Sequence, residues 1–231
     1  MSSLPSSPPA ILLDAGNTVV FLDHQALADV LVERGHAVEA STLAARQREA
    51  TDRYAARLEA GAGHEDGWRI LMKSLIALGG VPESDLEASV DAVRTEHDRY
   101  NLWRRVPGEV RDALKRFRAS GRPVAIVSNS EGQLDRLFAR TELTDMFDLV
   151  VDSAIEGVRK PDPELFRRAL SRLGLPPDDC IYAGDIPAVD VVGARAAGLS
   201  PVLIDALDQH RDYTDAPRFR SIADLADALG L

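Results

Sequence analysis

Residues 10–18 of the chain read AILLDAGNT. The apolar run ends directly at Asp14, and Gly16-Asn17 follows at once, which is typical of a buried strand that enters a turn. A carboxylate at the end of such a strand is hard to explain by packing. Asp14 is therefore the first candidate functional residue.

The second half of the chain alternates between helical and strand patterns. Helices are predicted at 108–120, 132–141, 163–173 and 189–197, and strands at 123–128, 147–151, 180–184 and 201–204. Alternation of this kind predicts an α/β fold, a doubly wound parallel sheet with helices on both faces. In such sheets the ligand lies beyond the carboxyl ends of the strands.

The segment between these two regions has a helical pattern throughout. Apolar spacing and turn residues predict four successive helices, which indicates a small bundle inserted after the first strand. We therefore expect a core domain of residues 10–22 and 102–231 and a helical cap domain of residues 23–101. Residues 1–9 are rich in Ser and Pro and are expected to be a disordered tail.

Composition narrows the classes of protein. The 231 residues carry a net charge of -10, which disfavours a nucleic-acid partner. No apolar run approaches the roughly 20 residues that cross a bilayer, so no membrane partner is expected. Cys180 is the single cysteine, which excludes an intramolecular disulfide and favours a cytoplasmic location. The sequence leaves the oligomeric state open.

Polar residues also end two later strands. Ser128 ends the strand at 123–128 and Asp185 follows the strand at 180–184, while Lys160 and Asp190 lie at the starts of helices. Carboxylates that converge from separate strands form the hard oxygen site that Mg²⁺ prefers. A hydroxyl and an ammonium suit phosphoryl oxygens, and Asp14 could then attack phosphorus.

Four short motifs in this order resemble the haloacid dehalogenase superfamily of hydrolases. They are Asp14 to Thr18 after an apolar strand, Ser128-Asn129 after another, Lys160 within RKPDP, and Gly184-Asp185 with Asp190 five residues after Asp185. Each motif alone is weak, but their order and spacing match over about residues 10–205. The helical insert is similar to the cap that closes over the active site in this family.

The resemblance implies a role for each matching residue. It implies that the catalytic residues are Asp14, Ser128 and Lys160. It implies that the metal ligands are Asp14, Asp185, Asp190 and the Gly16 carbonyl, with Asp190 alternatively a support for the other ligands. It also implies that the substrate-binding residues are Gly16, Asn17 and Asn129. The implied function is that of a Mg²⁺-dependent phosphatase. It would act on a small phosphorylated metabolite through an aspartyl-phosphate.

One position departs from the family pattern. Phosphatases of the family usually carry a second Asp two residues after the nucleophile as acid and base, and here that position is Gly16. A positioned acid/base contributes roughly 10²–10⁴-fold in rate. The departure keeps open a phosphonatase-like or dehalogenase-like hydrolase, and a binding or regulatory module without turnover. Lys73 is the candidate Schiff-base lysine, and His24 is a candidate substitute acid.

Overall fold

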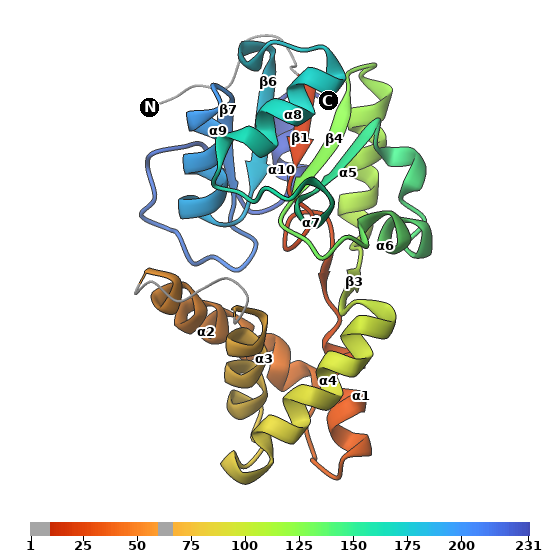
Figure 1. The fold of residues 1–231 in the computed structure, drawn as a ribbon, viewed down its shortest axis with the longest axis vertical. Helices are drawn as coiled ribbons and strands as arrows, with labels where there is room; N and C mark the ends of the chain where they lie inside the picture. Colours follow the sequence, from red (N-terminus) through yellow and green to blue (C-terminus); the bar gives the residue numbers. More distant parts are fainter. Residues whose placement is uncertain (1–9, 60–66) are drawn as a thin grey trace. The chain divides into compact units, whose positions relative to one another are not determined.

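The structure, a computed structural model, describes residues 10–59 and 67–231 (Figure 1). The predicted tail at residues 1–9 lies outside the described residues. The chain divides into two compact units, one formed by Met1–Phe21 and Arg104–Leu231 and the other by Leu22–Trp103. Each unit is described by itself below.

The first unit is built on a six-stranded sheet. Its strands are β1 (Ala10–Leu13), β4 (Val124–Ser128), β5 (Leu149–Asp152), β6 (Cys180–Gly184), β7 (Ser200–Ile204) and β8 (Arg218–Phe219). They lie in the order β5-β4-β1-β6-β7-β8, and every pair is parallel. The predicted doubly wound parallel sheet is confirmed, with β1 near its middle.

The register of the central strands decides which residues meet at the carboxyl edge. Leu13 pairs with Ile126 of β4 on one side and with Ala183 of β6 on the other. The next residue, Asp14, therefore leaves the sheet between the ends of β4 and β6. Its backbone N–H donates to the carbonyl of Ala183 at 2.8 Å, which continues the ladder into the site.

Helices connect these strands. They are α5 (Gly108–Ala119), α6 (Leu134–Arg140), α7 (Ser153–Glu156), α8 (Pro163–Leu173), α9 (Val192–Ala196) and α10 (Ile222–Ala228), with short turns η3 (Thr144–Met146) and η4 (Pro177–Asp179). The helix predicted at 189–197 is divided into a π-helical turn η5 (Pro187–Val191) and α9. The elements α7, β8 and α10 were not predicted.

One face of the sheet packs against α8 and α9. Leu12, Val127 and Tyr182 project to this face from β1, β4 and β6, and they join a buried cluster with Phe166 of α8 and Ala194 of α9. The rings of Phe166 and Tyr182 meet edge to face, with centroids 4.8 Å apart. Because side chains alternate along a strand, this places the Tyr182 side chain under α8.

The start of α8 follows the third motif directly. The Asp162 side chain accepts a hydrogen bond from the Glu164 N–H, and Pro163 occupies the first turn. These are favourable helix-starting residues, since the cap satisfies a free N–H and proline has none to lose. The segment that carries Lys160 is therefore fixed at its carboxyl end by a well-defined helix start.

The second unit contains the four predicted helices. They are α1 (His24–Glu33), α2 (Ala40–Glu59), α3 (Gly67–Leu78) and α4 (Leu86–Tyr100), with the turn η2 (Glu83–Asp85) before α4. Their apolar faces form one cluster that includes Leu27, Leu43, Met72 and Val90. Where the chain enters and leaves this unit, β2 (Phe21–Leu22) and β3 (Trp103–Arg105) pair as a two-stranded sheet.

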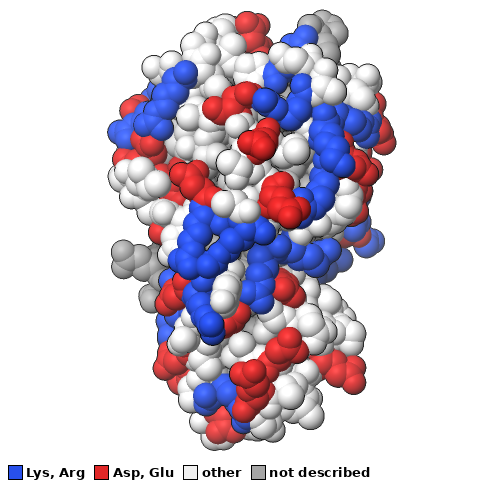
Figure 2. Space-filling model, turned by 90° about the vertical axis from the view of Figure 1, so that its right-hand side faces the viewer, with Lys and Arg blue, Asp and Glu red and all other residues white. Residues whose placement is uncertain are grey.

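Charged side chains of both signs cover the surface. On the face in Figure 2, Lys and Arg as well as Asp and Glu appear at several places among uncharged residues. Among the described residues, the structure has no helix long and apolar enough to span a membrane.

Gly193 provides a stability test of the core unit. A Cβ at this position would lie 2.7 Å from Phe166 Cε2 and 2.9 Å from the Pro161 carbonyl oxygen. Gly193→Ala should therefore lower the free energy of unfolding by about 1–3 kcal/mol, as overpacking does in a close-packed core. The measurement is urea unfolding followed by circular dichroism.

Gly108→Ala is the matched control. Gly108 begins α5, and a Cβ there meets nothing within 4 Å. This variant should be neutral or more stable by up to about 1 kcal/mol, because alanine restricts the unfolded chain. Equal stability of the two variants would contradict the close approach of α9 to Pro161.

Candidate functional site

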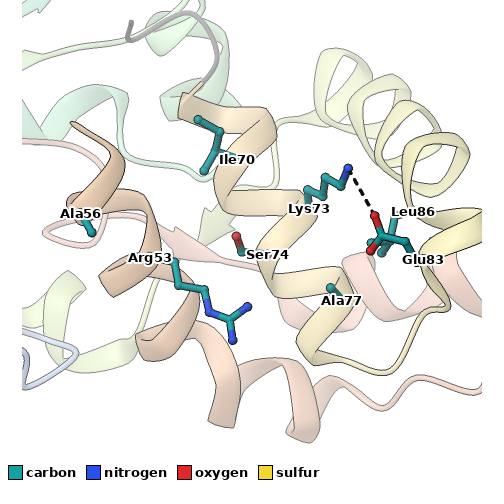
Figure 3. Close-up of a pocket in the computed structure, with 8 residues that line it drawn as sticks. All are labelled: Arg53, Ala56, Ile70, Lys73, Ser74, Ala77, Glu83 and Leu86. Carbon is teal, nitrogen blue, oxygen red and sulfur yellow. Dashed lines mark ion pairs between the residues drawn. The ribbon is translucent and has the colours of Figure 1, made fainter. Parts of the chain in front are cut away.

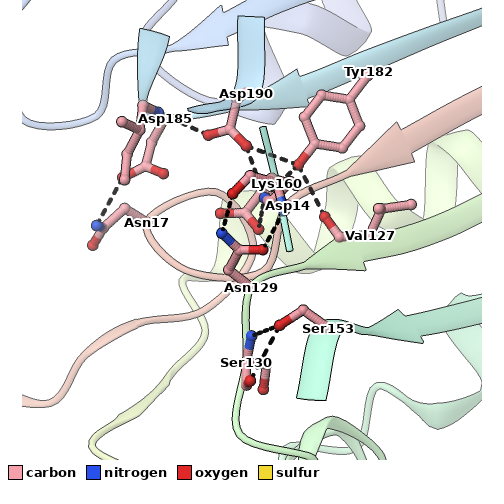
Figure 4. Close-up of polar contacts among 11 residues, drawn as sticks. Asp14, Asn17, Val127, Asn129, Ser130, Ser153, Lys160, Tyr182, Asp185 and Asp190 are labelled. Atoms are coloured by element: carbon pink, nitrogen blue, oxygen red, sulfur yellow. Dashed lines mark hydrogen bonds and ion pairs between the residues drawn. The ribbon is translucent and has the colours of Figure 1, made fainter. Parts of the chain in front are cut away.

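The ammonium of Lys160 is at the centre of a buried polar cluster (Figure 4). Its Nζ donates to Asp14 Oδ1 at 2.6 Å, to Asp190 Oδ1 at 2.7 Å and to the Tyr182 hydroxyl at 2.7 Å. The Lys160 side chain is only 2% exposed. Burial lowers the pKa of this lysine, but the adjacent charges of Asp14 and Asp190 outweigh burial and raise it above the usual value. The ammonium therefore stays charged at neutral pH.

Asp190 is held on both of its oxygens. Oδ1 lies 2.7 Å from Lys160 Nζ and 3.0 Å from the Tyr182 hydroxyl, and Oδ2 accepts the N–H of Ile186 at 2.8 Å. The side chain lies directly over Gly184, where a Cβ would come within 2.6 Å of Asp190 Oδ2. Glycine at 184 is therefore what lets Asp190 reach Lys160.

Asp14 keeps a narrow opening to solvent. Its side chain is 11% exposed, whereas that of Asp190 is 1% exposed. Burial raises the pKa of the Asp14 carboxyl above its usual range, and the Lys160 ammonium and a hydrogen bond from Ser128 only partly oppose this. Ser128, at the end of β4, is itself buried. The predicted nucleophile and hydroxyl thus lie close together.

Asp185 reaches the same place from the end of β6. Its Oδ2 accepts a hydrogen bond from Asn17 Nδ2 at 2.9 Å, and Asn17 has a positive φ of 50° that turns its side chain out of the tight loop after β1. Burial, and then repulsion by Asp14 and Asp190, raise the pKa of the Asp185 carboxyl well above its usual value. Asn17 thus contacts a predicted metal ligand.

Three carboxylates at this edge form a group with the chemistry of a cation site. Asp14, Asp185 and Asp190 each present one oxygen, and these oxygens lie within 4.8 Å of one another. Carboxylate oxygens at such spacing fit a hard divalent cation, which would also relieve their mutual repulsion. Asp14 and Asp185 are the better placed ligands, because both oxygens of Asp190 already accept hydrogen bonds within the cluster.

Gly16 lies in the loop that follows β1. This loop is closed by hydrogen bonds from the Asn17 N–H to the Val20 carbonyl and from the Val19 and Val20 N–H groups to the Ala15 carbonyl. The carbonyl of Gly16 takes part in none of these bonds. Gly16 is also not among the glycines with a positive φ, so its backbone conformation is open to any residue.

Asn129 connects the second and third motifs. Its Nδ2 donates to the Lys160 carbonyl at 3.0 Å and its Oδ1 accepts the Lys160 N–H at 2.8 Å. The sequence predicts a substrate contact for Asn129, and the structure engages its amide with the main chain of Lys160. The lysine is therefore fixed at its backbone as well as at its ammonium.

Two supporting groups escaped the sequence analysis. Asp152, at the end of β5, accepts the N–H groups of Gly132 and Ala154 at 3.0 Å, and the Ser153 hydroxyl accepts the Ser130 N–H at 3.0 Å. Both shape the loop after Ser128. A polar residue directly after the predicted strand at 147–151 was the same signal that identified Asp14, so the pattern could have found Asp152.

Tyr182 is the other unpredicted member of the site. It is fully buried in β6, and its hydroxyl lies 2.9 Å from the Val127 carbonyl oxygen. The only sequence signal is a hydroxyl-bearing ring two residues before Gly184, within a strand that otherwise reads as apolar core.

The two alternative acid or amine candidates belong to the helical unit. His24 Nε2 lies 2.8 Å from Gln47 Oε1. Lys73 forms an ion pair with Glu87 at 2.6 Å, and the hydrogen bond and charge of Glu87 raise the pKa of Lys73. A protonated lysine is a poor Schiff-base nucleophile.

Lys73 also lines a pocket of about 550 Å³ in the helical unit with Arg53, Ile70 and Leu86 (Figure 3).

Curated proteins are similar to part of this chain. Phosphoserine phosphatase from Thermus thermophilus is 33% identical over 160 residues, which are 69% of this chain and 62% of that protein. Glyceraldehyde 3-phosphate phosphatase from Pyrococcus furiosus is 34% identical over 106 residues, 45% of this chain and 43% of that protein. The chain thus spans less than two thirds of the length of these relatives.

Solved structures share the fold. The magnesium-bound HAD-hydrolase YfnB from Bacillus subtilis matches with a TM-score of 0.73 at 16% identity, over 98% of this chain and 100% of that one. The sequence profile of the haloacid dehalogenase-like hydrolases matches residues 8–198. With the fold, the four motifs and the profile in agreement, the chain belongs to the family of haloacid dehalogenase-like hydrolases.

Proposed function

We propose that the protein is a Mg²⁺-dependent phosphatase that forms an aspartyl-phosphate on Asp14. The observation that carries this proposal is the contact of Asp14 Oδ1 with the Lys160 ammonium at 2.6 Å, beside the Asp185 carboxyl, at the open edge of the sheet. A carboxylate that is held by a cation and keeps a narrow opening to solvent is suited to nucleophilic attack.

The metal part of the proposal rests on the donor set. Asp14, Asp185 and the Gly16 carbonyl offer hard oxygens, and Asp190 holds Lys160 beside them. When bound there, Mg²⁺ supplies positive charge that offsets the clustered carboxylates and polarises a phosphoryl oxygen. YfnB, a protein of the same fold, contains bound magnesium.

The chain's own residues would share the remaining work. Asp14 attacks phosphorus as the bond to the leaving oxygen breaks, and water then hydrolyses the acyl phosphate and regenerates Asp14. In this proposal the Ser128 hydroxyl contacts a phosphoryl oxygen. Lys160 keeps the Asp14 carboxyl oriented and partly neutralised.

The names of two relatives support a substrate class. Two relatives are named as phosphatases of phosphoserine and of glyceraldehyde 3-phosphate, which supports a small phosphorylated metabolite here. We infer that the helical unit, residues 22–103, acts as the cap and supplies specificity. A cytoplasmic location is part of the proposal, since Cys180 has no second cysteine to pair with.

The first test is turnover of p-nitrophenyl phosphate with Mg²⁺, with EDTA, and in Asp14→Asn. Wild type should be active only with the metal. Asp14→Asn should fall to about 1% or less of that rate, because the amide has nearly the same shape but is a poor nucleophile. Asp135→Asn, an exposed change on α6, is the control that should keep full activity.

Each other outcome has a definite meaning. Full activity in EDTA would remove Mg²⁺ from the proposal. Wild type that binds Mg²⁺ without any turnover would instead favour the binding or regulatory module that Gly16 leaves open. If Asp14→Asn were nearly as active as wild type, Asp14 would not be the nucleophile.

A second prediction concerns stability and pH. The folded-state pKa of Asp185 is raised, so its contribution to stability is present below the unfolded pKa and is lost as pH rises through the folded value. Asp185→Asn cannot ionise, and Asn17 can still donate to its carbonyl. In EDTA at neutral pH this variant should melt about 2–4 °C higher than wild type, as about 1 kcal/mol would give in a chain of this size.

The same variant should lose the response to metal. Mg²⁺ should raise the melting temperature of wild type by mass action and leave Asp185→Asn unchanged. Thermal unfolding with and without Mg²⁺ at neutral pH measures both effects. A variant that is less stable than wild type in EDTA, or that still responds to Mg²⁺, would contradict the assignment of Asp185.

The third prediction addresses Gly16. Without a proton donor there, aryl phosphates should react much faster than alkyl phosphates, because a poor leaving group needs protonation. Gly16→Asp should raise alkyl turnover relative to aryl turnover and recover part of the roughly 10²–10⁴-fold acid/base contribution. Since Gly16 does not have a positive φ, backbone strain does not oppose the substitution.

The measurement is the ratio of kcat/KM for a sugar phosphate to that for p-nitrophenyl phosphate, with thermal melting to confirm folding. A folded Gly16→Asp variant with an unchanged ratio would refute the missing-acid explanation. Comparable rates for both substrates in wild type would show that another residue supplies the proton, and His24→Asn would be the next variant.

A further inference from the structure

The Tyr182 hydroxyl is fixed by groups that cannot easily move. It accepts a hydrogen bond from Lys160 Nζ at 2.7 Å, and it lies 2.9 Å from the Val127 carbonyl oxygen and 3.0 Å from Asp190 Oδ1. Its single proton can go to one of these two acceptors. Val127 is part of the central sheet, and Asp190 is held by the N–H of Ile186, so the position of the hydroxyl oxygen is determined by the core.

The protons of Lys160 are fully used inside the protein. An ammonium has three protons, and Asp14, Asp190 and Tyr182 provide one acceptor for each. With a side chain that is 2% exposed, Lys160 has no proton directed to solvent. A substrate could receive a hydrogen bond from it only if one of the three present bonds were broken.

We propose that Tyr182 is a positioning residue whose hydroxyl directs the Lys160 ammonium onto Asp14, so that the ammonium acts on the nucleophile and not on the substrate. This proposal rests on the proposed phosphatase function for its kinetic consequences. Direct contact with the phosphoryl oxygens is then left to other groups, with Ser128 the first candidate.

Removal of the hydroxyl leaves a specific defect. The lysine stem has four flexible carbons, so its ammonium is directed only by the acceptors around it. Without the Tyr182 oxygen, one N–H in a dry site has no partner, which is unfavourable, and the ammonium must shift away from its present geometry. Phenylalanine keeps the edge-to-face contact with Phe166, so the surrounding core is retained.

The test is the kinetic comparison of Tyr182→Phe with wild type on p-nitrophenyl phosphate. We expect kcat to fall about tenfold or more, the scale of a lost hydrogen bond to a charged group. The KM and the inhibition constant of inorganic phosphate should change less than about twofold, since Lys160 does not contact the substrate in this arrangement. Unchanged kcat, or weaker phosphate binding in proportion to the loss of kcat, would overturn the proposal.

Tyr213→Phe is the matched control. Tyr213 belongs to the same unit and packs against the buried cluster of Val191, Leu203 and Ala216, and it is not one of the three hydrogen-bond acceptors of Lys160. Its hydroxyl is removed in the same way, and both kinetic constants should stay at their wild-type values. An equal loss of kcat in Tyr213→Phe would assign the effect to the core in general and overturn the specific role of Tyr182.

A double-mutant cycle on stability tests the contact without any activity. Tyr182→Phe should shift the urea midpoint in the wild-type background and have a clearly smaller effect in Lys160→Met, where the ammonium is missing. Equal shifts in the two backgrounds would overturn the proposal. If wild type and Tyr213→Phe both lack metal-dependent turnover, the proposed function fails, and this cycle alone decides whether Tyr182 holds Lys160.

Discussion

The buried ammonium of Lys160 is the interaction on which the geometry of the site depends. It joins Asp14 from the end of β1 to Asp190 from η5, with both contacts under 3 Å and almost no solvent. A buried ion pair is favourable only when its remaining hydrogen-bonding groups are also satisfied. Here Tyr182 accepts the third proton, and Asn129 binds the Lys160 backbone at both its N–H and its carbonyl. A flexible side chain is therefore fixed at both ends.

This arrangement places strict demands on the residues around it. Asp190 can approach Lys160 only because Gly184 has no side chain, and α9 can pack against Pro161 only because Gly193 has none. The π-helical turn of η5 is part of the same geometry, since it carries Asp190 inward at the point where a regular helix was predicted. Gly184 and Gly193 are therefore required by close contacts, and neither has a positive φ.

Much of the fold was predictable because buried strands and helix ends have strong local signals. The strand at 180–184 and the helix at 163–173 match β6 and α8 at both ends, the helix because Asp162-Pro163 starts it and Gly174 ends it. By contrast, β8 has two residues, too few for a periodic pattern. The order of strands was not predictable either, since it arises from contacts between segments far apart in the sequence.

The same distinction applies to the candidate site. Asp14, Ser128 and Asp185 were found because polar residues stand out where buried strands end. Tyr182 was missed because a ring inside a strand is normal in a core, and only its neighbours reveal that its hydroxyl matters. The role of Asn129 was also beyond the sequence, because its partner is the backbone of Lys160, which lies 31 residues away in the chain.

The charges of the site lead to one more conclusion about the proposed function. When ionised, Asp14, Asp185 and Asp190 carry three negative charges against the single positive charge of Lys160, so the cluster has two in excess. Burial raises the pKa of Asp185 most and repulsion by Asp14 and Asp190 adds to it, and the same excess of negative charge would repel a phosphate dianion. Lys160 cannot supply the missing attraction, because its single positive charge is already counted against the three carboxylates. A divalent cation would restore neutrality, and so the proposed function requires one for binding of an anionic substrate as well as for its reaction.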